Sequence, residues 1–155
     1  MKLGQGSFGI VYLVEKLNLD GTGADMKQLP TGKYYAMKIL NKKQILGQNL
    51  VRYAKTERDV MTYLKHPFII GLKYAFQTPE KLFLILEYGA GGNMSRTLKK
   101  CKRFTEDVAR LYLAEILLAL EDMHSREIIY RDLKPDNIVF DEKGHAMVTD
   151  FGLAK

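Results

Sequence analysis

The feature that most constrains the fold is a segment near the end of the chain, IIYRDLKPDNIVFDEKGHAMVTDFG. It contains two short apolar runs, Ile138 to Phe140 and Ala146 to Val148, joined by a polar loop that ends in Gly144. A glycine that can take positive φ suits such a loop, so the segment predicts an antiparallel hairpin. Asn137 enters one strand and Asp150 leaves the other, so we expect both side chains at the open end of the hairpin.

The polar side chains at this open end suit phosphate chemistry. The amide oxygen of Asn137 and the carboxylate of Asp150 are hard oxygen donors, which favour Mg²⁺ together with a bound phosphate. Asp132 is placed to accept a proton from an incoming hydroxyl group, and Lys134 can neutralise charge on a phosphoryl group during its transfer. For any one of these residues alone, an ordinary turn or cap is the alternative.

Composition sets outer limits on the function. The chain has 155 residues, 46% hydrophobic and 27% charged, as in a soluble globular domain or a piece of a larger one. The formal net charge of +6 favours anionic partners such as phosphates. Because the basic residues are scattered, we expect no nucleic-acid partner, and a basic nucleic-acid-binding module is the rival class.

Location follows from equally general features. The longest apolar run, Leu111 to Leu120, is too short to cross a bilayer and contains Glu115, so we expect no membrane span. No secretory signal follows Lys2. The lone cysteine, Cys101, allows no internal disulfide and suits a reducing compartment. We therefore expect the protein in the cytoplasm, with the nucleus as a second candidate compartment.

The remaining pattern predicts a mostly antiparallel sheet with one helix, followed by a helical part, which is an α+β fold in two lobes. The expected elements are, in order, two strands around a Gly-rich turn (1–15), a long loop (18–32), an interior strand (33–40), a helix (48–64), two strands (67–77 and 81–88), a flexible Gly linker (89–92) and a long helix capped by Thr105 (105–123).

Two charged residues stand where apolar residues are expected. The apolar face of helix 48–64 passes through Glu57, and Lys38 lies among apolar neighbours in strand 33–40. A carboxylate that faces a core is costly unless it meets a cation, so we expect Lys38 and Glu57 to pair. Such a pair would also hold the ammonium group in place for a phosphate. The alternative is a rotated helix with Glu57 in solvent and Lys38 reaching the edge of the sheet.

The start of the chain, Gly4-Gln5-Gly6-Ser7-Phe8-Gly9, offers a second phosphate-binding element. Glycines allow backbone N–H groups to approach an anion closely. A plain tight turn is the alternative for this pattern taken alone. A dinucleotide-binding fold needs a helix after the last glycine, but residues 10–15 have the composition of a strand. The loop is therefore expected to cover phosphates from within a β-hairpin.

Taken together, these segments resemble a eukaryotic protein kinase of the serine/threonine type. The chain is similar to the AGC group, and within it to ribosomal-protein, cyclic-nucleotide-dependent and Akt-type kinases. The resemblance implies the bilobal kinase fold, with the small lobe in 1–88, its first strand truncated, and the hinge and a partial large lobe in 89–155. The motifs that carry the resemblance are Gly4 to Val11, Tyr35-Ala36-Met37-Lys38, Glu57, Tyr130-Arg131-Asp132-Leu133-Lys134-Pro135-Asp136-Asn137 and Asp150-Phe151-Gly152.

The resemblance implies ATP and Mg²⁺ as cofactors and gives roles to individual residues. Asp132, Lys134, Lys38 and Glu57 would serve catalysis, and Asn137 and Asp150 would hold the metal. Met61, Leu72, Tyr130 and Phe151 would stack as the hydrophobic spine of the active state. The nucleotide would contact Leu3, Gly4, Gln5, Gly6, Ser7, Phe8, Gly9, Ile10, Val11, Ala36, Lys38, the gatekeeper Leu86, the backbone of Glu87 and Gly89, Met94 and Val139.

The resemblance also implies protein substrates and, for the full-length protein, an upstream activating kinase. Asn93 stands where many AGC kinases have Glu, which weakens a preference for basic peptides, although Asp136 keeps a carboxylate. The chain ends soon after Gly152, so we hypothesise a kinase fragment that binds nucleotide poorly and phosphorylates little by itself. A kinase-like nucleotide-binding scaffold without activity is the alternative.

Overall fold

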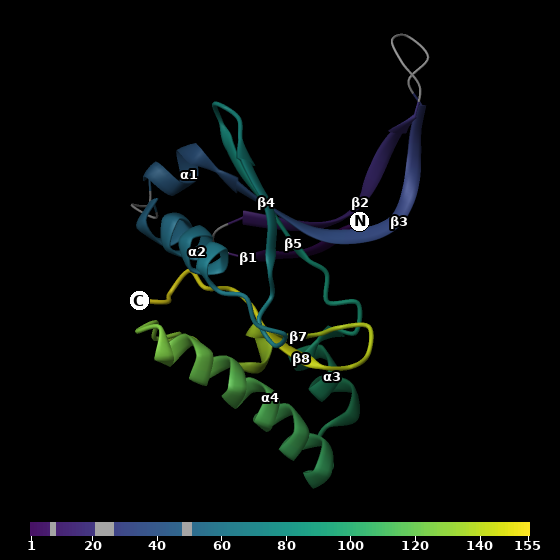
Figure 1. Cartoon of the computed structure of the whole chain (residues 1–155), viewed down its shortest axis with the longest axis vertical. Helices are drawn as coiled ribbons and strands as arrows, with labels where there is room; N and C mark the ends of the chain where they lie inside the picture. The colour runs from purple at the N-terminus through teal and green to yellow at the C-terminus, as the bar shows by residue number, and fades with distance from the viewer. Residues whose placement is uncertain (7–8, 21–26, 48–50) are drawn as a thin grey trace.

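The computed structural model describes residues 1–6, 9–20, 27–47 and 51–155 (Figure 1). Its first half is a five-stranded antiparallel sheet in the order β1-β2-β3-β5-β4. The expected interior strand is confirmed, because β3 lies at the centre of this order. The strands are β1 (Lys2–Gly6), β2 (Gly9–Asp20), β3 (Lys27–Asn41), β4 (Leu72–Gln77) and β5 (Lys81–Glu87).

Two helices follow β3, and the second half of the chain packs below them and the sheet (Figure 1). That half contains the long helix α4, which crosses the lower part of the molecule beneath a small three-stranded sheet in the order β6-β7-β8. Its elements and the two helices are α1 (Lys42–Gly47), α2 (Val51–Tyr63), β6 (Gly92–Asn93), α3 (Met94–Cys101), α4 (Glu106–Ser125), a 3₁₀ turn (Pro135–Asn137), β7 (Ile138–Phe140) and β8 (Ala146–Val148).

The hairpin expected near the end of the chain is confirmed. β7 and β8 pair antiparallel, with Ile138 opposite Val148 and Phe140 opposite Ala146. Gly144 takes a φ of 90°, a conformation that glycine reaches without strain. The carboxylate of Asp141 accepts hydrogen bonds from the N–H groups that follow it in the loop, which closes the turn.

The expected loop over 18–32 is wrong for every residue of it that the structure describes. β2 continues to Asp20 and β3 begins at Lys27, and these ends pair as a long ribbon that projects beyond the sheet (Figure 1). Thr31 and Gly32 add side-chain and backbone hydrogen bonds to Lys16 and Glu15. Both faces of the ribbon are largely exposed, so no buried apolar alternation marks these residues as strands.

The sequence pattern did not predict two short helices, α1 and α3. α1 has six residues, too few for a helical period. α3 begins at Met94 and is capped by Asn93, whose side chain accepts a hydrogen bond from the N–H of Arg96. The expected helix over 48–64 is confirmed as α2 over Val51–Tyr63, while residues 48–50 of that prediction lie outside the described part of the chain. The helix capped by Thr105 is confirmed as α4.

The strand expected over 67–77 begins later, at Leu72. Its first residues instead join the other half of the chain, because Ile70 donates a backbone hydrogen bond to Val148 and Val148 donates one to Phe68. The link between α2 and β4 is therefore attached to β8. A continuous apolar core joins both halves through this region, with Met61, Leu64, Ile69, Tyr130 and Phe151 among its buried members.

α4 buries one face and exposes another. Ile116, Ala119 and Met123 are buried, at the spacing of one helix face. Leu111, Leu113, Leu117 and Leu118 are 48–62% exposed and lie on both sides of the buried face. Within the residues that the structure describes, no helix is both long and apolar enough to cross a membrane.

The two ends of the glycine-rich segment differ in how much space surrounds them. A Cβ atom on Gly9 would overlap the carbonyl oxygen of Ile39, whereas one on Gly4 would meet no atom within 4 Å. We expect Gly9→Ala to lower the free energy of unfolding by about 1–3 kcal/mol, the usual range for overpacking. Gly4→Ala is the matched control and should unfold at nearly the denaturant midpoint of the unchanged protein. Equal midpoints for the two variants would contradict the close approach of β2 to β3.

A buried carboxylate joins α4 to the β7–β8 hairpin. Glu115 is 4% exposed, and its two oxygens meet Nδ1 of His145 at 2.6 Å and the N–H of Ala146 at 2.7 Å. The hydrogen bond with Glu115 raises the pKa of His145 above its ordinary value, with Asp141 adding to the rise and Lys143 opposing it.

This raised pKa makes stability depend on pH in a defined direction. Protonated His145 contributes fully below its ordinary pKa of 6.5, and the contribution is lost as the pH rises through the higher pKa of the folded state. We expect the thermal midpoint of the unchanged protein to fall relative to His145→Gln as the pH is raised from about 6 to about 9. His124→Gln, at an exposed position of α4, should keep the original pH dependence.

Candidate active site

α2 and β3 bring together the two charges that the sequence placed in apolar surroundings. Nζ of Lys38 lies 2.5 Å from Oε1 of Glu57, and the two residues are only 8% and 2% exposed. Nζ of Lys38 also lies 3.4 Å from Oδ1 of Asp150. The predicted pair is therefore confirmed, and the alternative with Glu57 in solvent is wrong. One ammonium group thus connects the sheet, α2 and the segment after β8.

The surroundings of this pair fix its charge. Burial alone would lower the pKa of Lys38, but the carboxylates of Glu57 and Asp150 outweigh burial and raise that pKa. Lys38 is therefore a cation at neutral pH. Burial raises the pKa of Glu57, which the nearby ammonium group opposes. Glu57 consequently depends on Lys38 to stay ionised in the core.

The segment between α4 and β7 holds the predicted catalytic carboxylate. Nζ of Lys134 lies 2.9 and 2.8 Å from the two oxygens of Asp132. Nδ2 of Asn137 donates to Oδ2 of Asp132 at 2.7 Å and to its backbone carbonyl at 2.9 Å. The hydrogen bond from Lys134, with help from Asn137, lowers the pKa of Asp132. Asp132 is therefore an ionised, oriented carboxylate that can accept a proton.

Asn137 and Asp150 meet at the open end of the β7–β8 hairpin. The N–H of Thr149, next to Asp150, donates to the carbonyl oxygen of Asn137 at 2.9 Å. Phe151 is fully buried against Tyr130, with 5.5 Å between ring centroids, while the carboxylate of Asp150 stays 40% exposed. Asp150 takes a φ of 64°, and its carboxylate reaches the buried ammonium group of Lys38 at 3.4 Å.

The donor set at this end fits Mg²⁺. The amide nitrogen of Asn137 donates to Asp132, which leaves the amide oxygen as the side-chain atom that could coordinate a metal. No cluster of three or more His, Cys, Asp or Glu side chains occurs in the described part of the chain. Two protein oxygens with phosphate and water supplying the rest is the usual arrangement for Mg²⁺ bound with a nucleotide.

The predicted adenine site draws residues from both halves of the molecule. Ala36, on β3, pairs with Leu86 on β5. Leu86 and Met94 belong to the apolar core, and Ala36 and Val139 pack against it. Their common contact with an adenine stays a prediction. Leu3 also approaches this region, because Arg96 of α3 donates to its carbonyl oxygen at 3.3 Å.

The glycines of this region allow close contact. A Cβ atom on Gly89 would lie 2.8 Å from Cβ of Val139, so the expected linker is packed tightly against β7. The β1–β2 hairpin pairs Gln5 with Ile10 and Gly6 with Gly9, and β2 pairs with β3 at Val11 opposite Lys38. The roles predicted for Ser7 and Phe8 fall outside the described residues. Of the predicted spine, Met61, Tyr130 and Phe151 are in the core and Leu72 packs against it.

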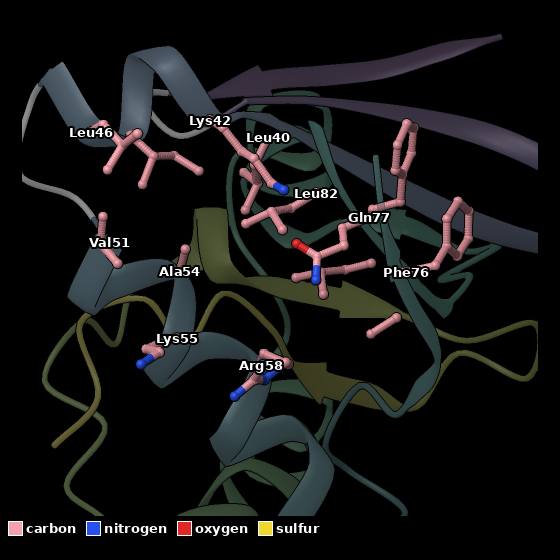
Figure 2. Close-up of a pocket in the computed structure, with 14 residues that line it drawn as sticks. Leu40, Lys42, Leu46, Val51, Ala54, Lys55, Arg58, Phe76, Gln77 and Leu82 are labelled. Carbon is pink, nitrogen blue, oxygen red and sulfur yellow. The ribbon is translucent and has the colours of Figure 1, made fainter. Parts of the chain in front are cut away.

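A hollow of about 430 Å³ was not anticipated from the sequence. Figure 2 shows it between α1, α2 and the β4–β5 hairpin. Leu40 and Leu82 form part of its apolar lining, and Lys55 and Arg58 of α2 lie along one side. In the sequence, only the helical spacing of Val51, Ala54, Lys55 and Arg58 pointed to one side of this hollow. The sequence alone does not show that α1 and the β4–β5 hairpin lie opposite that helix face.

The site defines a class of protein, and comparison with known proteins agrees. The family model for the protein kinase domain matches residues 1–155. The chain therefore belongs to the protein kinase family. The α+β fold inferred from the sequence is confirmed by this membership.

The most informative relatives are ribosomal and RAC-family kinases. Over 153 residues, 99% of this chain, it is 51% identical to ribosomal protein S6 kinase alpha-3 of Mus musculus and of Homo sapiens. Over the same length it is 46% identical to the RAC family serine/threonine-protein kinase homolog of Dictyostelium discoideum. The chain spans 19% of the former relatives and 32% of the latter. These matches confirm the resemblance to the AGC group that the motifs indicated.

Proposed function

We propose that the protein containing this chain transfers the γ-phosphate of ATP to serine or threonine hydroxyls of proteins. The observation that carries the proposal is the position of Lys38 between Glu57 and Asp150, with the Asp132–Asn137 network beside Asp150 in the same fold. A fixed cation and an ionised carboxylate that can act as a base support this proposal. The relatives whose names include serine/threonine-protein kinase and S6 kinase support the same activity.

In this proposal each residue has a distinct task. Lys38 binds nonbridging phosphate oxygens of ATP, and the backbone of the Gly4–Gly9 lid covers them. Asp132 orients the substrate hydroxyl and takes its proton as the oxygen attacks the γ-phosphorus. The bond from that phosphorus to the β–γ bridging oxygen breaks, and ADP leaves. Lys134 offsets negative charge on the phosphoryl group during transfer.

Asn137 and Asp150 would hold Mg²⁺, which supplies Lewis-acid neutralisation of the phosphate charge when it is bound. The chain's own contribution is to fix the two oxygen donors. Asn137 is held by Asp132, and Asp150 is held by the buried ring of Phe151. The chain would thus orient both oxygen donors before any metal is bound.

The preference among protein substrates rests on Asp136 more than on Asn93. The side chain of Asn93 accepts from the N–H of Arg96 at 3.2 Å and donates to the carbonyl oxygen of Asp136 at 2.6 Å. It carries no charge, so it offers little to a basic substrate. Asp136 is exposed and keeps its carboxylate. We further propose an upstream activating kinase and a cytoplasmic location, with the nucleus as a second compartment.

Thermal unfolding of the full-length protein with and without Mg²⁺ and ATP tests the nucleotide site. Ligand at a hundred times its Kd should stabilise the folded state by about 2.7 kcal/mol. We expect this stabilisation to require Mg²⁺ and ATP together and to be much smaller in the variant Asp150→Asn. Asp107→Asn, at the exposed start of α4, is the matched control and should keep the full gain.

Two results would contradict the proposed activity. One is stabilisation by an oligonucleotide but not by Mg²⁺ with ATP, which would indicate a nucleic-acid-binding module. The other is normal Mg²⁺-dependent ATP binding without transfer to any serine or threonine peptide, after treatment with an activating kinase. That second result would indicate a nucleotide-binding scaffold.

A further inference from the structure

We propose that Lys73 is a positioning residue for adenine recognition, acting through the side chain of Glu87. The inference rests on the proposed function, in which the backbone of Glu87 contacts the adenine edge. Glu87 is the last residue of β5, at the point where the chain leaves the sheet for the linker to the other half. Anything that fixes this residue also fixes the backbone expected to meet the base.

Both carboxylate oxygens of Glu87 are bound by residues at or just before the start of β4. Oε1 lies 2.6 Å from Nζ of Lys73, and Oε2 accepts a hydrogen bond from the N–H of Gly71 at 3.0 Å. The N–H of Glu87 in turn donates to the carbonyl oxygen of Gly71 at 3.0 Å. Main chain and side chain of Glu87 are thus tied to the same short segment, and we name Gly71, Lys73 and Glu87 the hinge clamp.

The local backbone is built to make this contact. The pairing of β4 with β5 is regular at Leu72 opposite Leu86 but shifts between Leu72 and Tyr74. Such an irregularity redirects the side chain of the residue within it, which here is Lys73. A Cβ atom on Gly71 would lie 3.1 Å from Cδ and Oε2 of Glu87, so a side chain there would press on the carboxylate.

A surface ion pair alone would be a weak basis for this inference. The side chains of Lys73 and Glu87 are 43% and 37% exposed, and such pairs contribute little to folding. The hinge clamp differs because its second bond comes from a backbone N–H and because the adjacent Leu86 is buried in the core. The contact therefore restricts the direction of the hinge backbone, and a restricted binding group loses less freedom when it meets its ligand.

The test compares two nucleotides in the full-length protein. ATP can donate its 6-amino group to the carbonyl oxygen of Glu87, whereas purine riboside triphosphate lacks that group. We expect Lys73→Ala to raise the KM for ATP about two- to fivefold, the effect that an exposed ion pair supports, with kcat unchanged. The KM for the analogue should stay the same. Lys73→Arg should restore the KM for ATP.

Two further variants keep the result interpretable. Gly71→Ala should raise the KM for ATP selectively, because the added methyl group displaces the carboxylate. Lys81→Ala, an exposed lysine at the start of β5, is the matched control and should leave both KM values unchanged. Thermal midpoints of all variants show whether each is folded at the assay temperature.

Defined outcomes overturn the hinge clamp. Equal changes in KM for both nucleotides would mean that Lys73 acts on the general shape of the cleft. No change for either nucleotide would mean that Glu87 needs no side-chain support. In both cases the unchanged protein still transfers phosphate, so the proposed function stands. Absence of transfer by the unchanged, activated protein would overturn the proposed function and the hinge clamp together.

Discussion

We expect Asp132→Asn to lower kcat for transfer to a serine peptide by about 10²- to 10⁴-fold, the usual contribution of a general base. The KM for ATP should change little, because Lys38, which is proposed to bind the phosphates, is held by Glu57 and Asp150 and not by Asp132. Asparagine preserves the shape of the side chain and removes its basicity. Lys134 and Asn137 donate to the Asp132 carboxylate, so the geometry that the variant disturbs is a local one.

The ionisation of Asp132 sharpens this expectation. Its lowered pKa means that the carboxylate is charged throughout the neutral range, so wild-type kcat should not fall near pH 6 through protonation of this residue. Steady-state kinetics on Asp132→Asn and on the surface control Asp107→Asn provide the measurement. A kcat within a few-fold of the unchanged protein would assign the base to another residue.

The second large effect concerns the buried pair of Lys38 and Glu57. Lys38→Met should abolish measurable transfer and lower the free energy of unfolding by about 3–5 kcal/mol, because it leaves a carboxylate without its cation in the core. The double variant Lys38→Met with Glu57→Leu should recover most of that stability, since apolar residues of similar size often replace a buried pair without loss. The double variant should remain inactive, which separates the structural from the chemical role of the pair.

The pH dependence of stability offers an independent check on the variant Lys38→Met. Without its cation, Glu57 can enter the folded core at low cost only as the neutral acid, so its folded pKa is raised further. A raised folded pKa gives stability at low pH that is lost as the pH rises. Urea denaturation should therefore show that the free energy of unfolding of Lys38→Met falls further below that of the unchanged protein as the pH rises from about 5 to about 8. A deficit that is constant with pH, or a double variant no more stable than Lys38→Met, would contradict the buried-pair account.

The parts of the site that the sequence predicted share one property, which is that an unusual residue is visible within a local pattern. Glu57 interrupts an apolar helix face, Lys38 interrupts an apolar strand, and Gly144 ends a polar loop between two apolar runs. The cost of burying an unpaired charge, or the need for a glycine in a tight turn, then allows few local structures. The kinase motifs added the order and identity of the other site residues.

The parts that escaped prediction have no such local mark. The β2–β3 ribbon is held by backbone pairing between exposed residues, so its side chains show no buried alternation. α1 is too short to show a period. The hinge clamp depends on Gly71 and Glu87 meeting across a strand pair, and neither residue is unusual within its own segment. Contacts of this kind follow from the assembled fold.

The attachment of Phe68 to Ile70 onto β8 has a mechanical consequence. The chain crosses between its two halves at the linker 88–92, and the hydrogen bonds between Ile70, Val148 and Phe68 make a second crossing. Two bodies joined at two places swing most easily about the line through both. The second crossing therefore limits how the half that contains the five-stranded sheet can turn on the half that contains α4.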